Sequence, residues 1–186
     1  MSIYEFEKKK PSIGRGTFVF NSADVIGDVI IGENCYIGPG ARIRGDYGSI
    51  RIGSDTAVEE NVVIHARPDD KTIIDNHVTI GHGSIIHNAV IHDWAVIGMG
   101  AIVSDWAEIG EWAVVAEGAV VKNKQKIPNK AIAVGIPARV VSEISLNYEK
   151  QWTKYKKIYS NLARKRFPNS LKIVELLEGV LNENTS

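Results

Sequence analysis

The sequence of 186 residues has a single cysteine and no excess of charge of either sign. One thiol, Cys35, excludes an intrachain disulfide framework and fits a reducing compartment. Lys+Arg and Asp+Glu both number 22, so the net charge gives no argument for nucleic acid or a membrane surface as a partner. No stretch approaches the roughly 18 apolar residues of a membrane helix, and residues 1–12 lack the apolar run of a signal peptide. These absences predict a soluble, cytoplasmic protein.

What the sequence does contain is a repeat of six residues. An aliphatic residue leads each unit, glycine often follows it, and a small residue often stands four places after it. A unit of this size cannot bury a face alone, so the units must stack into coils that share one core. The regularity argues against an antiparallel sandwich, which would show alternation of period two and hairpin turn pairs. The leading aliphatics are Val19, Val25, Ile31, Ile37, Ile43, Ile52, Val58, Ile64, Ile74, Ile80, Ile86, Ile91, Ile97, Val103, Ile109, Val115 and Val121.

The repeat is interrupted at three places near the middle of the chain. The step 43–52 contains three extra residues, the step 64–74 contains four, and the step 86–91 is one residue short. These irregular units surround the histidines, so they change how successive coils align there.

The C-terminal part of the chain has a different pattern. Trp152, Tyr155 and Tyr159 follow an i, i+3, i+7 stripe, which predicts an amphipathic helix. Pro168 is expected to break this helix, and Ser170 can cap a second one after it.

The six-residue pattern resembles the hexapeptide-repeat family. That resemblance implies a left-handed parallel β-helix with three hexapeptides in each coil, although general rules for parallel strands favour right-handed crossovers. We therefore expect an all-β solenoid over residues 1–141, which ends at "IPARVV" (136–141), and a helical tail over residues 142–186. The tail is expected to pack on the β-helix or on a neighbouring subunit. The repeat alone does not decide the function, because many acyltransferases share it.

Five histidines lie within 28 residues of one another: His65, His77, His82, His87 and His92. Three imidazoles with an open fourth position are a typical set of ligands for catalytic zinc. His65 and His87 each follow a leading isoleucine, so they occupy equivalent places one coil apart if the insertion bulges outward. Adjacent strands lie about 4.8 Å apart, which lets these two side chains share a metal. His77 and His92 are expected to be surface residues.

His82 occupies a different place, the third of its unit, on the preceding face of the coil. Five extended residues span up to roughly 17 Å, so His82 is not expected to reach a metal held by His65 and His87 in the same chain. A neighbouring subunit can supply it, which predicts a metal at a subunit interface, repeated symmetrically in a closed ring. The alternative is that all three are outward polar residues without a metal.

The histidine region also resembles the γ-class carbonic anhydrase family, including its phenylacetate-pathway thioesterase-like and carnitine-operon branches. The resemblance implies a homotrimer with Zn²⁺ between subunits, held by His65 and His87 of one chain and His82 of the next. It places Arg44 and Asp46 at the interface beside the metal. Fe²⁺ or Co²⁺ would also suit imidazole ligands. The matching segments are "RGD" (44–46), "VEENVVIH" (58–65), "GHGSIIH" (81–87), "IGMGAIVSDWAEIG" (97–110) and "GIPARVV" (135–141).

Two positions depart from the pattern of that family. Glu59-Glu60 stands where the family has a Gln-Asp pair, and Tyr47 stands where its best-known member has an acidic residue. A carboxylate at Glu59 can accept the proton of a bound water as a general base, or it can over-stabilise the metal and slow ionisation of that water. Glu59 could equally be exposed to solvent without a chemical role.

The histidine pattern and this resemblance together imply a zinc-dependent, carbonic anhydrase-like lyase that hydrates CO₂ to bicarbonate with hydroxide formed at the metal. Glu59, Arg44 and Asp46 are the expected catalytic residues. Three alternatives stay open: a metal-dependent acyl-CoA thioesterase, a coenzyme A-dependent acyltransferase with a histidine base, and a non-catalytic metal-binding trimer. In each case we expect a small-molecule ligand and no nucleic acid or membrane partner.

Overall fold

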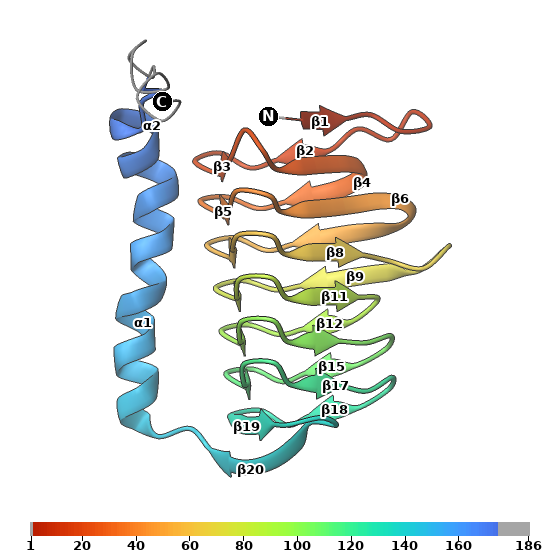
Figure 1. Ribbon diagram of the computed structural model, residues 1–186, viewed down its shortest axis with the longest axis vertical. Helices are drawn as coiled ribbons and strands as arrows, with labels where there is room; N and C mark the ends of the chain where they lie inside the picture. Colours follow the sequence, from red (N-terminus) through yellow and green to blue (C-terminus); the bar gives the residue numbers. More distant parts are fainter. Residues whose placement is uncertain (1, 175–186) are drawn as a thin grey trace, which may run out of the picture.

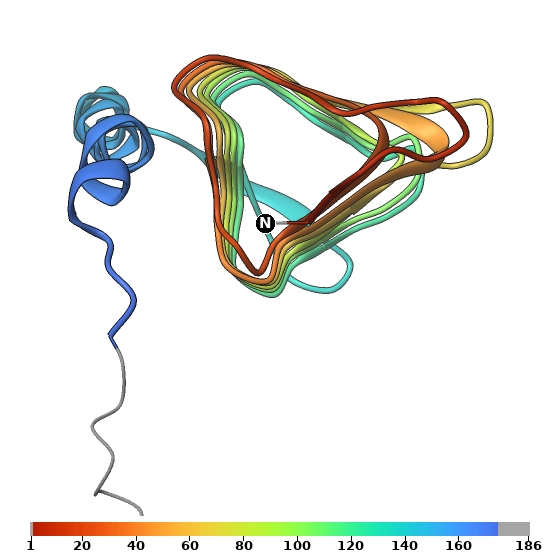
Figure 2. The same ribbon diagram turned by 90° about the horizontal axis from the view of Figure 1, so that it is seen from above.

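In the computed structural model, which describes residues 2–174, the chain winds into coils of short strands with a triangular cross-section (Figures 1 and 2). The predicted all-β solenoid, a left-handed parallel β-helix, is confirmed. The strands are β1 (Ser2–Tyr4), β2 (Ser12–Ile13), β3 (Phe18–Val19), β4 (Asp24–Ile31), β5 (Tyr36–Ile37), β6 (Arg42–Ile52), β7 (Ala57–Val58), β8 (Val63–His65), β9 (Lys71–Ile74), β10 (Thr79–Ile80), β11 (Ile85–His87), β12 (Val90–Ile91), β13 (Val96–Ile97), β14 (Ile102–Val103), β15 (Glu108–Ile109), β16 (Val114–Val115), β17 (Val120–Val121), β18 (Lys126–Ile127), β19 (Ala131–Val134) and β20 (Arg139–Glu143).

Two sheets form the three faces of this prism. The twelve-stranded sheet covers two faces, because the long strands β4 and β6 turn a corner. β6 pairs with β8 on one side of the corner and with β9 on the other. The eight-stranded sheet, in the order β20-β19-β16-β13-β10-β7-β5-β3, forms the third face. Strand pairs in the described part are parallel, except that β20 runs antiparallel to β19 at the last coil.

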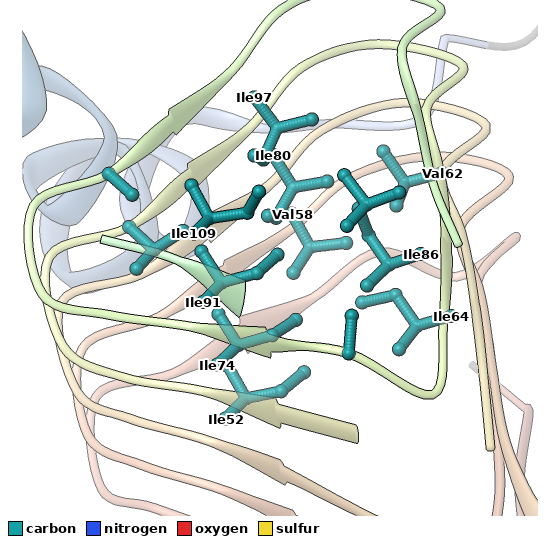
Figure 3. Close-up of a cluster of buried hydrophobic side chains, with 14 of the residues drawn as sticks. Ile52, Val58, Val62, Ile64, Ile74, Ile80, Ile86, Ile91, Ile97 and Ile109 are labelled. Atoms are coloured by element: carbon teal, nitrogen blue, oxygen red, sulfur yellow. The ribbon is translucent and has the colours of Figure 1, made fainter. Parts of the chain in front are cut away.

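The leading aliphatics of the repeat point into the prism and stack in columns (Figure 3). Val58, Ile80 and Ile97 form one such column, because β7, β10 and β13 pair in register, and all three are fully buried. Burying one aliphatic side chain contributes roughly 1.5–3 kcal/mol, so each added coil adds to the stability of the stack. Cys35 occupies an inward small position, and burial raises the pKa of its thiol to about 11, as fits a structural thiol.

The three irregular steps of the repeat all fall at one corner of the prism. The step 43–52 lies within β6, the step 64–74 runs from β8 to β9, and the step 86–91 runs from β11 to β12. Figure 2 shows the coils spreading apart at this corner. Because the extra residues bulge outward, β8 and β11 stay in register and His87 pairs directly with His65. The expected position of these two histidines in adjacent coils is therefore confirmed.

A single helical segment runs along the eight-stranded sheet, opposite in direction to the advance of the coils (Figures 1 and 2). β20 crosses the predicted boundary at residue 141, and α1 (Leu146–Asn161) follows it. The side chain of Ser145 accepts the backbone N–H of Tyr148 and caps the first turn. α1 continues through a π-helical turn, η1 (Leu162–Arg166), into α2 (Phe167–Ser170). The predicted helix is confirmed, and Tyr159 packs on Tyr36 with ring centroids 5.4 Å apart, whereas Tyr155 of the predicted stripe is 57% exposed.

The predicted break of the helix at Pro168 is wrong. Pro168 lies within α2, directly after the π-helical turn, and the helical segment continues past it to Ser170. Ser170 is the last residue of α2 and does not cap a second helix, and residues 171–174 are not helical. The rest of that predicted second helix lies outside the described residues.

None of the helices within residues 2–174 combines the length and the apolar character needed to cross a membrane.

Candidate functional site

The two histidines at the ends of β8 and β11 face each other on the outer side of the twelve-stranded sheet. Nδ1 of His65 lies 3.2 Å from Nε2 of His87. Two nitrogen ligands of a tetrahedral zinc ion, each 2.0–2.1 Å from the metal, are separated by about 3.3 Å. The facing nitrogens therefore have the spacing of two ligands of one metal ion.

Behind His65, the other ring nitrogen contacts a carboxylate. Nε2 of His65 lies 2.9 Å from Oδ1 of Asp46, and Nη1 of Arg44 donates to Oδ2 of Asp46 at 2.9 Å. The backbone N–H of Tyr47 donates to Oδ1 as well. Burial alone would raise the pKa of Asp46, but these hydrogen bonds and the charge of Arg44 bring it below its ordinary value. Asp46 is therefore an ionised acceptor that fixes the orientation of the His65 ring.

Behind His87 stands a second carboxylate with its own arginine. Nδ1 of His87 lies 2.6 Å from Oδ1 of Asp105, and Nη2 of Arg67 donates to Oδ2 at 2.7 Å. The hydrogen bond from Arg67 lowers the pKa of Asp105. The sequence reasoning missed both residues. Asp105 stands 18 residues after His87, but the short step 86–91 leaves this coil with 17 residues, so the residue equivalent to His87 is Ser104. Arg67 lies in the irregular step 64–74, so the repeat pointed to neither residue.

His82 lies at a different corner, between β10 and β11. Its Nε2 is 3.0 Å from Oε2 of Glu59, its backbone N–H donates to the same carboxylate, and its Nδ1 contacts Oε2 of Glu60. Tyr36 donates its hydroxyl to Oε1 of Glu60 at 2.6 Å. The side chain of His82 is 46% exposed, whereas Glu59 is only 5% exposed. The expectation that Glu59 could be a solvent-exposed residue is therefore wrong, because the carboxylate is buried behind His82.

The three histidines do not meet within one chain. Across residues 2–174, no group of three or more His, Cys, Asp or Glu side chains is arranged to hold a metal ion. This agrees with the expectation that His82 cannot join His65 and His87 in the same subunit. The contribution of His82 from a neighbouring subunit stays a prediction.

The other two histidines lie away from this pair. His77 stacks on Trp94, with ring centroids 4.1 Å apart. His92 lies between Asp75 and Glu108, at 3.0 and 3.3 Å. Burial would lower the pKa of His92, but the hydrogen bonds to the two carboxylates raise it above its ordinary value. Both residues have structural partners on the surface and do not adjoin the candidate site.

Known proteins resemble this chain in both sequence and fold. The carnitine operon protein CaiE of Salmonella newport (strain SL254) is 38% identical over 164 residues, which cover 88% of this chain and 82% of that protein. CaiE of Escherichia coli (strain SMS-3-5) is 37% identical over 145 residues, 78% of this chain and 74% of that protein.

Solved structures and a family model agree with these relatives. A presumed acetyltransferase from Bacillus cereus superposes with a TM-score of 0.86 at 34% identity, covering 88% of this chain and 95% of that one. A hexapeptide transferase family protein from Anaplasma phagocytophilum gives 0.84 at 30% identity, covering 88% and 96%. Residues 10–45 match the model described as bacterial transferase hexapeptide (six repeats). The chain therefore belongs to the hexapeptide-repeat transferase family, together with the carnitine operon proteins CaiE.

Proposed function

We propose that this protein is a metalloenzyme that works as a homotrimer, with His65 and His87 of one subunit and His82 of the next holding a zinc ion. The observation that carries the proposal is the pair of ring nitrogens 3.2 Å apart, with a carboxylate behind each ring. Histidines that bind metals almost always donate their other ring N–H to a carboxylate, a carbonyl or water.

The residues around the pair have distinct roles in this proposal. Asp46 and Asp105 each accept an N–H from one imidazole, which leaves the facing nitrogens free as ligands. Although burial alone would raise the pKa of Asp46, hydrogen bonds from His65 and the Tyr47 backbone, together with the charge of Arg44, lower it, and the hydrogen bond from Arg67 lowers the pKa of Asp105. Zinc bound by three neutral imidazoles lowers the pKa of a bound water to about 7 and so supplies a nucleophile at neutral pH.

His82 can take part only if one of its ring nitrogens is released from a carboxylate. Glu60 is the more exposed of its two partners and is also held by the hydroxyl of Tyr36, so its contact with His82 is the one expected to give way. Glu59 is buried and also accepts the backbone N–H of His82, so it stays as the orienting partner. Glu59 is therefore proposed as a positioning residue that acts through His82, rather than as a base.

The surface beside the histidine pair supports contact with a neighbouring subunit. Val63 and Ile85 stand two residues before His65 and His87 on β8 and β11, so they point to the same outer side. They are 39% and 41% exposed. A second subunit that brings its His82 to this face would cover them.

The proposed reaction is the hydration of CO₂ to bicarbonate. A second candidate, acyl transfer from coenzyme A, is supported by the B. cereus and A. phagocytophilum structures, which are described as a presumed acetyltransferase and as a transferase family protein. Acyl transfer would need a histidine base and no metal, so the metal separates the two candidates.

The test measures the metal content, the mass in solution and the CO₂ hydration rate of the purified protein and of His87→Ala. We expect a zinc-binding trimer whose hydration activity disappears with the metal in His87→Ala. His92→Ala is the matched control, because His92 also lies between two carboxylates but outside the pair. A wild-type protein that binds no transition metal would refute the metalloenzyme. A metal-loaded trimer without CO₂ hydration would refute the reaction only.

A further inference from the structure

A pocket of about 450 Å³ lies between α1 and the eight-stranded sheet. Its walls are mainly apolar, with Ile97 and Met99 on the side of the sheet and Trp152, Tyr155 and Leu162 on the side of the helical segment. Two carboxylates, Glu59 and Glu117, also line it. This volume is within the range of sites that bind small molecules, roughly 300–1,000 Å³. CO₂ is far smaller than the pocket, so the proposed reaction does not account for it.

One wall of the pocket contains a buried lysine. Lys156 is 5% exposed, and its Nζ donates to Oγ1 of Thr79 at 3.0 Å and to the carbonyl of Ala95 at 3.3 Å. No carboxylate within residues 2–174 forms an ion pair with it. Burial lowers the pKa of Lys156 to about 7, while the charge of Glu59 opposes this shift. An ammonium group has three donors, so the charged form has one donor left over.

The same wall contains a second donor without an acceptor. Nε1 of Trp152 is buried, and the described part of the chain offers it no hydrogen-bond partner. Trp152 and Lys156 are four residues apart on α1, so they lie on one side of the helix. A buried N–H without an acceptor is uncommon and unfavourable, because it has lost water without gaining a partner. A mainly apolar pocket in which Lys156 and Trp152 each have an unused donor is suited to a ligand with acceptor oxygens.

We propose that this pocket binds a small apolar carboxylate, whose oxygens accept hydrogen bonds from Nζ of Lys156 and Nε1 of Trp152. Its hydrocarbon part would lie against Ile97, Met99 and Tyr155. A carboxylate would form the direct ion pair that Lys156 does not make with any carboxylate of residues 2–174, and the mainly apolar walls favour a hydrocarbon body. The pocket ends near His82, but binding rests on the helical wall and needs no metal.

The test titrates the full chain with octanoate and, as a neutral ligand of equal chain length, with 1-octanol, using calorimetry. We expect saturable binding of octanoate and weaker binding of octanol. Lys156→Met, which keeps an apolar side chain of similar length, should weaken octanoate binding at least about tenfold and remove the preference over octanol. Trp152→Phe should weaken octanoate binding severalfold without affecting the charge. The matched control is Lys157→Met, the neighbouring lysine, which should bind like the wild type.

Several outcomes would overturn this proposal. They are the absence of saturable octanoate binding to the wild type, equal binding of octanoate and octanol, and unchanged binding by Lys156→Met. If the wild-type trimer does not bind octanoate and only dissociated subunits do, a neighbouring subunit occupies the pocket in the trimer. Repeating the titration after metal removal with a chelator separates this proposal from the proposed function, because octanoate binding should persist while CO₂ hydration is lost.

Discussion

At the scale of single residues, the chemistry of the candidate site depends on what stands behind each imidazole. Asp46 and Asp105 contact Nε2 of His65 and Nδ1 of His87 and so fix the orientation of the two rings. Each carboxylate is in turn held by an arginine, so the charge that the site needs is present before any ligand arrives. The two Asp–Arg pairs fix the orientation of the two rings, so that the other ring nitrogens face one another 3.2 Å apart.

Substitution of Asp105 tests this dependence on the second carboxylate. Asp105→Ala removes the acceptor of the His87 ring and leaves the ring itself in place. We expect zinc affinity to fall by about 10–100-fold, which is the usual effect of losing such a partner. Competition with a chelator of known affinity measures the change. Asp75→Ala, which removes a carboxylate from His92 instead, should leave the affinity unchanged. Equal affinity in Asp105→Ala and the wild type would contradict the proposed ligand role of His87.

Lys156 gives a prediction for the dependence of stability on pH. Its pKa falls from 10.5 to about 7 on folding, so between these values the unfolded chain binds more protons and the folded state gains stability as the pH rises. Between pH 7 and pH 9 this gain amounts to about 2 kcal/mol. Lys156→Met lacks it. Urea unfolding at fixed protein concentration should therefore show Lys156→Met stabilised relative to the wild type by about 2 kcal/mol more at pH 7 than at pH 9. A pH-independent difference would show that Lys156 keeps an ordinary pKa.

At the scale of elements, each short strand places core residues on its inner side and residues of the candidate site on its outer side. In β11, Ile86 points into the core column, while Ile85 and His87 point outward. The corner that follows takes up every irregular step of the repeat, which keeps β8 and β11 in register despite the insertions. A strand of three residues thereby serves the core on one side and the site on the other.

This division predicts opposite effects for neighbouring substitutions in β11. Ile86→Ala should destabilise the fold by about 2–5 kcal/mol, because it leaves a cavity in the core. Ile85→Glu should leave each subunit folded but shift the mass in solution from trimer toward monomer, because a charge would be buried at the proposed interface. Circular dichroism and light scattering measure the two effects. Ile30→Glu, at an exposed position of β4, is the control, and a stable trimer in Ile85→Glu would place the interface elsewhere.

Much of this element scale follows from the sequence, but not all of it. The six-residue period predicts the buried columns, because one inward aliphatic per unit leaves no other way to form a core. It also places His65 and His87 together once the insertion is assigned to a bulge. The pairing of Arg67 with Asp105 depends on the path of an irregular loop, which no period describes. Lys156 could not be found, because a lysine on a helix is ordinarily solvated and only the packing of α1 on the sheet buries it.

At the scale of the whole molecule, the solenoid presents two separate parts of one proposed site. The His65–His87 pair lies on the twelve-stranded sheet, and His82 lies at a corner that adjoins the sheet covered by α1. A prism with these parts on different faces can complete the site only by placing one subunit against the next, and a closed ring of subunits satisfies every copy at once. The proposed metal site therefore requires the proposed trimer.

Subunit complementation tests that claim most directly. His82→Ala and His87→Ala each remove one ligand type, so each alone should bind no zinc. When the two variants are unfolded, mixed equally and refolded together, about a quarter of the interfaces should pair an intact His65–His87 face with an intact His82. We therefore predict that the mixture recovers about a quarter of the wild-type zinc content. Two results would contradict a site shared between subunits. In the first, the wild type binds zinc but the refolded mixture recovers none. In the second, either variant alone binds as much zinc as the wild type.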